Sequence, residues 1–145
     1  MEHDGSFDQW WASQATCGRR PCTQGTFYEG YNISREAFSE YPFHNGFNTG
    51  DIMVLMGTPP QDISKGDVIV YRSERPDPII HRVIRITTTE TGHDFRTKGD
   101  HNWVSYPFES DITQDRYIGR AVLRIPYLGW VKIGFVKLLQ LISLP

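Results

Sequence analysis

Short apolar runs separated by turn signals dominate the sequence after Phe47 and restrict the fold more than any other feature. Three of these runs follow turns rich in Gly, Asp or Pro, at residues 52–56, 68–71 and 79–89. Two more, at residues 94–98 and 117–125, complete a set of about five or six predicted strands. Because no helical period separates the runs, the strands are expected to pair antiparallel. The predicted fold class is mainly β, with an antiparallel barrel-like or folded-sheet core.

The first 46 residues follow neither the strand period of 2 nor the helical period of 3.6. This region contains Trp10-Trp11, then small polar residues, then Tyr and Gly. We expect a long irregular N-terminal insertion, and loops of that length usually serve a binding role. The sequence therefore divides into an insertion at residues 1–46, a β core at 47–133 and an apolar tail at 134–145.

The charges nearly balance overall but are distributed unevenly. With 17 acidic residues against 15 Lys and Arg, the net charge of −2 argues against binding to nucleic acid through bulk positive charge. Every charged residue after Asp115 is basic, and the mostly apolar residues 125–144 have Tyr127 and Trp130 near their start. This composition is typical of a segment that approaches a membrane surface, and a final strand with a short core helix is the alternative.

The two cysteines, Cys17 and Cys22, are close enough in sequence to form a small disulfide ring. The four residues between them include Gly18 and Pro21, which favour a tight turn. A single pair of thiols is too few for a structural zinc site. We therefore expect a disulfide if the domain lies outside the cytosol. The glycosylation sequon Asn32-Ile33-Ser34 points to the same compartment.

Two polar features in the predicted core are candidates for chemistry. Strand alternation places His81 on one face with Ile79 and Val83, whereas Arg82 lies on the other face with its neighbours. His81 is either a core histidine or a general base, because an imidazole takes up a proton near neutral pH. Asp100, in the Lys-Gly-Asp-His-Asn run at residues 98–102, either makes a turn or orients a histidine.

Metal and phosphate sites are poorly supported. Several residues could ligate a metal, but no pair has the helical spacing of a zinc protease and no cysteine lies among them. The possible ligands are His81, His93, Asp94, Asp100 and His101. The glycines before residue 51 lead into a strand without the Lys and Ser/Thr of a phosphate-binding loop. We therefore expect no metal and no cofactor.

The order of these motifs resembles type I signal peptidases, specifically the archaeal and endoplasmic-reticulum branch in which a histidine replaces the lysine base of the bacterial enzymes. The matching segments are Thr49–Leu55, Lys65–Tyr71, Ile80–Ile84, Thr97–Asn102 and Ile118–Val122. They span about residues 47–133, and a His-Arg pair followed by Lys-Gly-Asp-x-Asn is a specific combination.

This resemblance implies a membrane-bound serine endopeptidase that removes signal peptides after a small-x-small sequence, with its catalytic domain on the extracytoplasmic or lumenal face. It implies the family's β fold, preproteins as substrates, and other signal peptidase complex subunits as partners. His81 corresponds to the general base and Asp100 to the acid of the Gly-Asp-x-Asn box. A second aspartate is expected downstream, for which we choose Asp111 over Asp115; either is otherwise a solvated surface residue.

The nucleophile is where the sequence departs from the resemblance. The family's serine is followed by Met, and some archaeal members read Ser-Met-Glu-His before a Trp-containing insertion. This chain begins Met1-Glu2-His3 and soon reaches Trp10, so we expect the serine immediately before Met1. Ser39 is the alternative, since Pro42 follows it at the family's interval. With the serine outside the chain we expect negligible peptidase activity, and a noncatalytic substrate-binding or membrane-assembly module is the alternative function.

Overall fold

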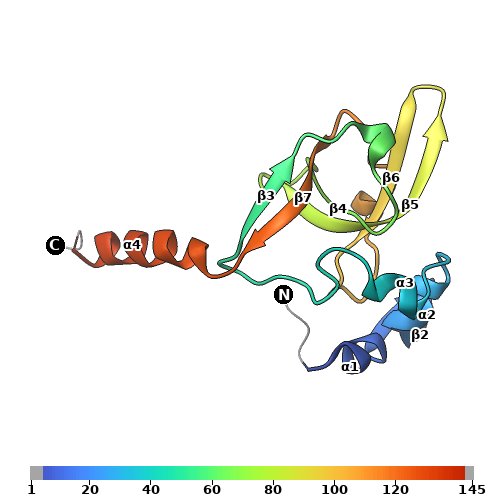
Figure 1. Cartoon of the computed structure of the whole chain (residues 1–145), viewed down its shortest axis with the longest axis horizontal. Helices are drawn as coiled ribbons and strands as arrows, with labels where there is room; N and C mark the ends of the chain where they lie inside the picture. The colour runs from blue at the N-terminus through green and yellow to red at the C-terminus, as the bar shows by residue number, and fades with distance from the viewer. Residues whose placement is uncertain (1–4, 143–145) are drawn as a thin grey trace.

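The core of the protein is one antiparallel sheet of five strands. The computed structural model describes residues 5–142. The strands are β3 (Ile52–Met56), β4 (Val68–Tyr71), β5 (Ile79–Thr89), β6 (Gly92–Lys98) and β7 (Tyr117–Ile125). Their order is β3-β7-β4-β5-β6, which leaves β3 and β6 at the two edges of a strongly curved sheet (Figure 1). The mainly β, antiparallel prediction is confirmed.

Strand β4 lies at the centre of this sheet, between β7 and β5. Its four residues, Val68–Tyr71, are all buried, as expected for a strand covered on both faces. The longest strand, β5, pairs with β4 through Ile69 and His81 and with β6 through Arg82 and Lys98. Its β-branched residues suit a pleated and largely covered surface. The pairing of β5 with both neighbours fixes the positions of His81 and Arg82 between β4 and β6.

Residues 6–43 form a separate layer on one side of the sheet, which we call the N-terminal cap (Figure 1). It contains α1 (Phe7–Trp11), the hairpin of β1 (Gln14–Cys17) and β2 (Arg20–Thr23), α2 (Gln24–Glu29) and α3 (Arg35–Ser39). The sequence predicted irregular structure here. Helices of five or six residues are too short to show a helical period. The local signals were their N-caps, because Ser6, Thr23 and Ser34 each accept a hydrogen bond from a backbone N–H three residues later.

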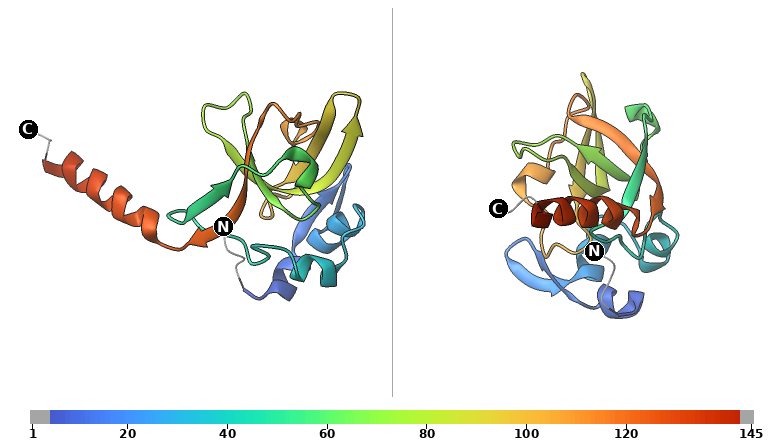
Figure 2. Two further views of the ribbon diagram at one scale, coloured as in Figure 1. Left: turned by 45° about the horizontal axis from the view of Figure 1, so that its top comes forward. Right: turned by 90° about the vertical axis from the view of Figure 1, so that its left-hand side faces the viewer.

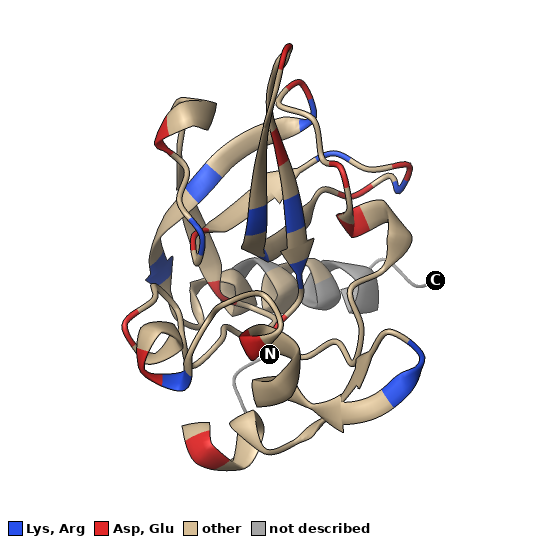
Figure 3. Cartoon of the chain, turned by 90° about the vertical axis from the view of Figure 1, so that its right-hand side faces the viewer, with Lys and Arg blue, Asp and Glu red and all other residues tan. Residues whose placement is uncertain are grey.

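A disulfide joins the two strands of the cap hairpin. Cys17 and Cys22 are bonded, with 5.8 Å between their Cα atoms, which confirms the predicted pairing. In Figure 3 the ribbon of the cap is mostly tan, with basic positions near the turn of this hairpin, where Arg19 and Arg20 lie. The cap therefore carries little charge apart from its outer rim.

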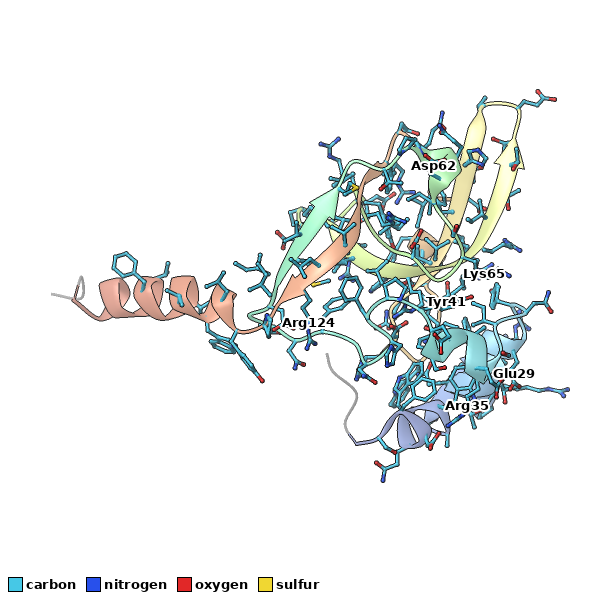
Figure 4. The ribbon with its side chains drawn as sticks, in the orientation of Figure 1. Glu29, Arg35, Tyr41, Asp62, Lys65 and Arg124 are labelled. Carbon is cyan, nitrogen blue, oxygen red and sulfur yellow. A yellow bond between two sulfur atoms is a disulfide. The ribbon has the colours of Figure 1, made fainter. Side chains whose placement is uncertain are left out.

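Two hydrophobic clusters lie on opposite faces of β5. The cap cluster consists of Trp10, Ala15, Phe27, Tyr28, Ile33, Phe38 and Ile84. The sheet cluster consists of Ile63, Ile69, Tyr71, Val83, Phe95 and Ile112. The neighbours Val83 and Ile84 thus point into different clusters, which confirms the alternation predicted for this strand. The cap and the sheet meet where Tyr41 and Lys65 lie in Figure 4, and Lys65 Nζ donates to the carbonyl of Tyr31 at 2.8 Å.

The chain continues after β7 into α4 (Leu128–Ile142), which projects away from the sheet and the cap (Figures 1 and 2). Its start is held by backbone N–H groups, from Gly129 to the carbonyl of Gly50 at 2.8 Å and from Tyr127 to Asp51 at 3.2 Å. Val131 and Phe135 are 69% and 60% exposed, so this segment is not a core helix. Within the described residues, no helix combines the length and apolarity that crossing a membrane requires. The predicted tail at residues 134–145 falls mostly on α4, and residues 143–145 lie outside the described part.

Phe38 is expected to be a main source of stability in the cap. Its side chain is fully buried and its ring lies 4.8–4.9 Å from the rings of Trp10 and Tyr28. Removing it leaves a cavity that the surrounding rings cannot fill, so Phe38→Ala should lower the free energy of unfolding by about 3–5 kcal/mol. Urea denaturation followed by tryptophan fluorescence measures this change. Phe135→Ala, on the exposed face of α4, is the matched control and should leave the midpoint unchanged.

Candidate active site

His81 lies in the middle of β5 and contacts a buried carboxylate. Its Nδ1 lies in contact with Oε1 of Glu109, whose side chain is fully buried. The imidazole itself is about one-fifth exposed. Its other nitrogen, Nε2, lies beside Gly99, where a Cβ atom would come within 2.6 Å of it. A glycine at position 99 is thus required for the close approach of this backbone to the histidine.

Glu109 is held in place by a short 3₁₀ turn, η2 (Pro107–Glu109), in the segment between β6 and β7. Pro107 suits the first position of such a turn because its backbone has no N–H to satisfy. The backbone N–H of Gly99 donates to Glu109 Oε1 at 3.2 Å, and that of Tyr106 donates to Oε2. These donors orient the carboxylate toward His81. The arrangement is that of a carboxylate that holds an imidazole in one orientation.

Asp100 has different partners. Its carboxylate accepts hydrogen bonds from Arg82, with Nη2 at 2.7 Å and Nε at 3.1 Å from both oxygens, and from the Tyr28 hydroxyl at 2.7 Å. Burial alone would raise the pKa of Asp100, but the charge and hydrogen bonds of Arg82 hold it below its ordinary value. Burial and the nearby Asp100 charge together raise the pKa of Tyr28 well above 10, so the phenol remains a donor.

Strand alternation explains why the two carboxylates serve different partners. His81 and Arg82 are neighbours on β5, so their side chains point to opposite faces of the sheet. Arg82 extends toward the cap, where its guanidinium lies 4.7 Å from the Phe38 ring and near Asp100. His81 extends to the other face, where Glu109 lies.

Two hollows meet at His81. The first, of about 290 Å³, has an apolar wall of Phe47, Val68 and Ile80 and polar residues that include His81 and Asp100. The second, of about 370 Å³, is lined by aromatic and basic residues, among them Tyr106, Phe108 and Arg75. His81 and Asn102 line both hollows. A peptide that passes His81 can therefore contact an apolar pocket on one side and an aromatic one on the other.

Comparison with known proteins identifies relatives of this arrangement. Over 94 residues the chain is 33% identical to the signal peptidase complex catalytic subunit SEC11C of Homo sapiens, covering 60% of this chain and 49% of that protein. The chain is a distant homologue of signal peptidase complex catalytic subunits. This confirms the resemblance to the endoplasmic-reticulum branch of type I signal peptidases.

Two further signal peptidase relatives agree with this relationship. The putative signal peptidase complex catalytic subunit SEC11B of Homo sapiens is 34% identical over 97 residues, or 62% of this chain and 56% of that protein. The catalytic subunit sec11 of Schizosaccharomyces pombe is 31% identical over 87 residues, or 55% and 44%. No family model matches the chain. The chain spans about half the length of the curated relatives it matches.

The structure brings some of the predicted signal peptidase residues together and separates others. His81 and Asp100 line the same hollow. Asp111 and Asp115 are exposed, and the described contacts of His81 include neither of them. The buried acid at His81 is Glu109, which the sequence analysis did not consider. The available signal was weak: Glu109 directly follows the apolar Pro107 and Phe108, but Ser110 and Asp111 come next.

The predicted nucleophilic serine is not found at His81 among the described residues. No serine within residues 5–142 is among the side chains that line the two hollows at His81. Ser39, the alternative, lies in α3 of the cap, where its hydroxyl donates to the carbonyl of Glu36 at 2.7 Å. The position before Met1 lies outside the chain, and residues 1–4 lie outside the described part. The catalytic roles of these residues remain predictions.

Asp100→Asn should destabilise the protein strongly. The substitution leaves the buried Arg82 without its counter-charge, and losing one partner of such a pair costs about 3–5 kcal/mol. Because the pKa of Asp100 is lower in the folded than in the unfolded protein, its stabilisation is present above about pH 4 and is lost as the pH falls through the folded-state pKa. Denaturation series should show that the free energies of unfolding of Asp100→Asn and wild type differ less at pH 3 than at pH 7. Exposed Asp111→Asn, as control, should behave as wild type.

Proposed function

We propose that this chain carries the catalytic domain of a signal peptidase, a serine endopeptidase that removes signal peptides from secreted preproteins after a small-x-small sequence. The observation that carries this proposal is the His81 imidazole, with a buried carboxylate at Nδ1 and a peptide-sized hollow on the exposed side, in a homologue of signal peptidase catalytic subunits. Its substrates would be signal-peptide-bearing preproteins, and other subunits of a signal peptidase complex would be its partners.

In the proposed mechanism, His81 is the general base. A serine hydroxyl gives its proton to His81 Nε2 while its oxygen attacks the scissile carbonyl carbon. Glu109, at Nδ1, stabilises the imidazolium that forms. As the C–N bond breaks, the imidazolium returns the proton to the leaving amine, and water then hydrolyses the acyl-enzyme. No cofactor takes part in these steps.

We propose different roles for the two predicted aspartates. Asp100 is bound to Arg82 and Tyr28, so we propose that it acts by fixing the loop beside His81 and by its negative charge in the same hollow. The role predicted for Asp111 is better filled by Glu109, two residues earlier, because Glu109 is buried against His81 whereas Asp111 is exposed.

The nucleophilic serine is proposed to come from outside the described residues. This is supported by the serines of residues 5–142, none of which lines the hollows at His81. The same observation favours the second candidate function, a noncatalytic signal-peptidase-like module that binds substrate or assembles at the membrane. The coding sequence upstream of Met1 discriminates between them: a serine codon directly before Met1, preceded by an apolar span, supports the peptidase.

The first hollow suits the proposed substrate. Its wall of Phe47, Val68 and Ile80 offers an apolar surface to the side chains of a bound peptide. A peptide bound across it would lie next to β5 in an extended conformation, because backbone pairing with a sheet is a common mode of peptide recognition.

Peptide hydrolysis tests the catalytic assignment. In the gene product that includes the sequence upstream of Met1, His81→Ala should lower kcat for a small-x-small signal peptide at least about 10⁴-fold, because the base is lost. Glu109→Gln keeps the shape but removes the charge that stabilises the imidazolium, and should cost about 10³–10⁴-fold. Mass spectrometry of the cleaved peptide measures both rates. His93→Ala, near the far end of the β5–β6 hairpin, is the matched control and should keep wild-type kcat.

The 145-residue chain alone should show negligible turnover in the same assay. Turnover by this chain that Ser39→Ala abolishes would place the nucleophile in the cap instead. Wild-type rates in His81→Ala would rule out the peptidase mechanism and leave the noncatalytic module as the better account.

We further propose that α4 rests on a membrane surface. Tyr127, Trp130, Val131 and Phe135 at its start are about half exposed or more, and aromatic residues are favoured at the membrane–water interface. The charged residues of the chain beyond Asp115 are all basic, which favours an anionic surface. The proposed location is therefore membrane-associated, with the catalytic domain on the extracytoplasmic or lumenal face, where the Cys17–Cys22 disulfide is stable.

Binding to lipid vesicles tests this placement. Val131→Glu and Phe135→Glu together should weaken co-sedimentation with vesicles of anionic and neutral phospholipid at least about tenfold, because two exposed apolar contacts are replaced by charges that anionic lipid repels. Thr88→Glu adds a charge at an exposed position on the β5–β6 hairpin and is the control. Equal binding of all variants would contradict the proposal.

A further inference from the structure

The loop that carries Asp100 is held by the N-terminal cap through its backbone. Trp10 Nε1 donates to the carbonyl of Asp100 at 3.0 Å, and the backbone N–H of Thr16 donates to the carbonyl of Trp103 at 2.7 Å. A third carbonyl of the loop, that of Asn102, accepts from Gln24 Nε2 at 3.1 Å. Three elements of the cap, α1, β1 and α2, thus each supply one donor to residues 100–103.

Gln24 connects both ends of this loop. Its side chain is 1% exposed, and its amide group donates to Asn102 and to the carbonyl of Gln14 at 3.3 Å. Its Oε1 accepts from Lys98 Nζ at 2.7 Å. Lys98 begins the Lys-Gly-Asp-His-Asn run and Asn102 ends it. One buried side chain therefore fixes the distance between the first and last residues of the run.

Lys98 depends on this contact. Its ammonium is buried, donates to the carbonyl of Gly99 at 3.1 Å as well as to Gln24, and lies about 5 Å from the rings of Phe27 and Tyr28. Burial lowers the pKa of Lys98 to about 8, although the charges of Asp100 and Glu109 oppose this change. Gln24 thus supplies a neutral oxygen to a cation that has little access to water.

The loop in turn contacts the candidate active site. The backbone N–H of Gly99 donates to the carboxylate of Glu109, and that of Asn102 donates to the carbonyl of Gly99 at 2.8 Å. Gly99 also lies against His81 Nε2. A shift of the loop therefore moves a hydrogen-bond donor of Glu109 and the backbone that faces the histidine.

We propose that Gln24 is a positioning residue, through which the N-terminal cap sets the Lys98–Asn102 loop against His81 and Glu109. The role in catalysis rests on the proposed peptidase function, whereas the positioning of the loop does not. Removing the amide leaves Lys98 Nζ and the Asn102 carbonyl with fewer partners inside the protein, and unpaired buried polar groups favour rearrangement of the segment that carries them.

Amide hydrogen exchange measured by NMR tests the positioning in the chain itself. Gln24→Met keeps the side-chain volume and removes all three polar contacts of the amide, so exchange of the Gly99 and Asn102 amides should accelerate about tenfold or more. The amides of β4 should keep their wild-type exchange rates. Gln24→Glu keeps the acceptor for Lys98 but loses the donor to Asn102. It should give an intermediate exchange rate and raise the pKa of Lys98, which the Cε chemical shift reports.

Gln114→Met is the matched control, because Gln114 Nε2 donates in the same way to a backbone carbonyl, that of Thr91, in the β5–β6 turn. Gln114→Met should leave the exchange rates of the Gly99 and Asn102 amides unchanged. If the proposed peptidase activity is present, Gln24→Met should lower kcat about tenfold with little change in KM, and Gln24→Glu should restore part of the loss.

Wild-type exchange at Gly99 and Asn102 in Gln24→Met would overturn the proposal, whether or not the protein cleaves peptides. Faster exchange with wild-type kcat would overturn its catalytic part. Faster exchange in the variant, together with no peptidase activity in any form including wild type, would support the positioning role and count against the proposed peptidase. If Gln24→Met does not fold, the exchange rates and the Lys98 pKa of Gln24→Glu decide the question.

Discussion

The buried pair of Arg82 and Asp100 is the interaction on which the rest of the structure depends. Arg82 is 1% exposed, and its guanidinium also donates to the carbonyls of Pro42, Phe43 and Gly66 at 2.8–3.0 Å. Pro42 and Phe43 lie at the end of the cap, Gly66 lies in the turn before β4, and Asp100 lies in the loop after β6. The planar fork of an arginine meets all of them at once, which a lysine could not do. One side chain thereby joins three segments that are far apart in sequence.

This pair also divides the site into two sides. The free energy gained from a buried ion pair is small because desolvation offsets the attraction, so the main effect of Arg82 and Asp100 is to specify one arrangement of the segments. With Asp100 bound on the cap side of β5, a second carboxylate must serve the histidine on the opposite side, and Glu109 fills that place. The two acids thus have different partners although they lie in the same region.

The strands of the sheet could be predicted because each one is a local run of apolar residues between turns. The runs at residues 52–56, 68–71, 79–89 and 117–125 coincide with β3, β4, β5 and β7, and alternation along β5 placed His81 and Arg82 on opposite faces. The partners of those side chains could not be predicted in the same way. Glu109 reaches His81 because η2 folds back to Gly99, directly after the end of β6, and no spacing in the sequence encodes that contact. The cap helices were missed because each is shorter than two turns.

A cap of about forty residues is a large addition to a small sheet, and its composition indicates what it does there. Six of the seven buried residues in the cap cluster come from the cap itself, and Ile84 is the contribution of the sheet. The cap therefore has much of a hydrophobic core of its own, and its disulfide stiffens the hairpin next to the loop. Because its polar contacts converge on residues 98–103, rigidity of the cap is transmitted to the backbone that faces His81. Loops are usually more mobile than the elements they connect, and here a packed layer holds the loop beside His81.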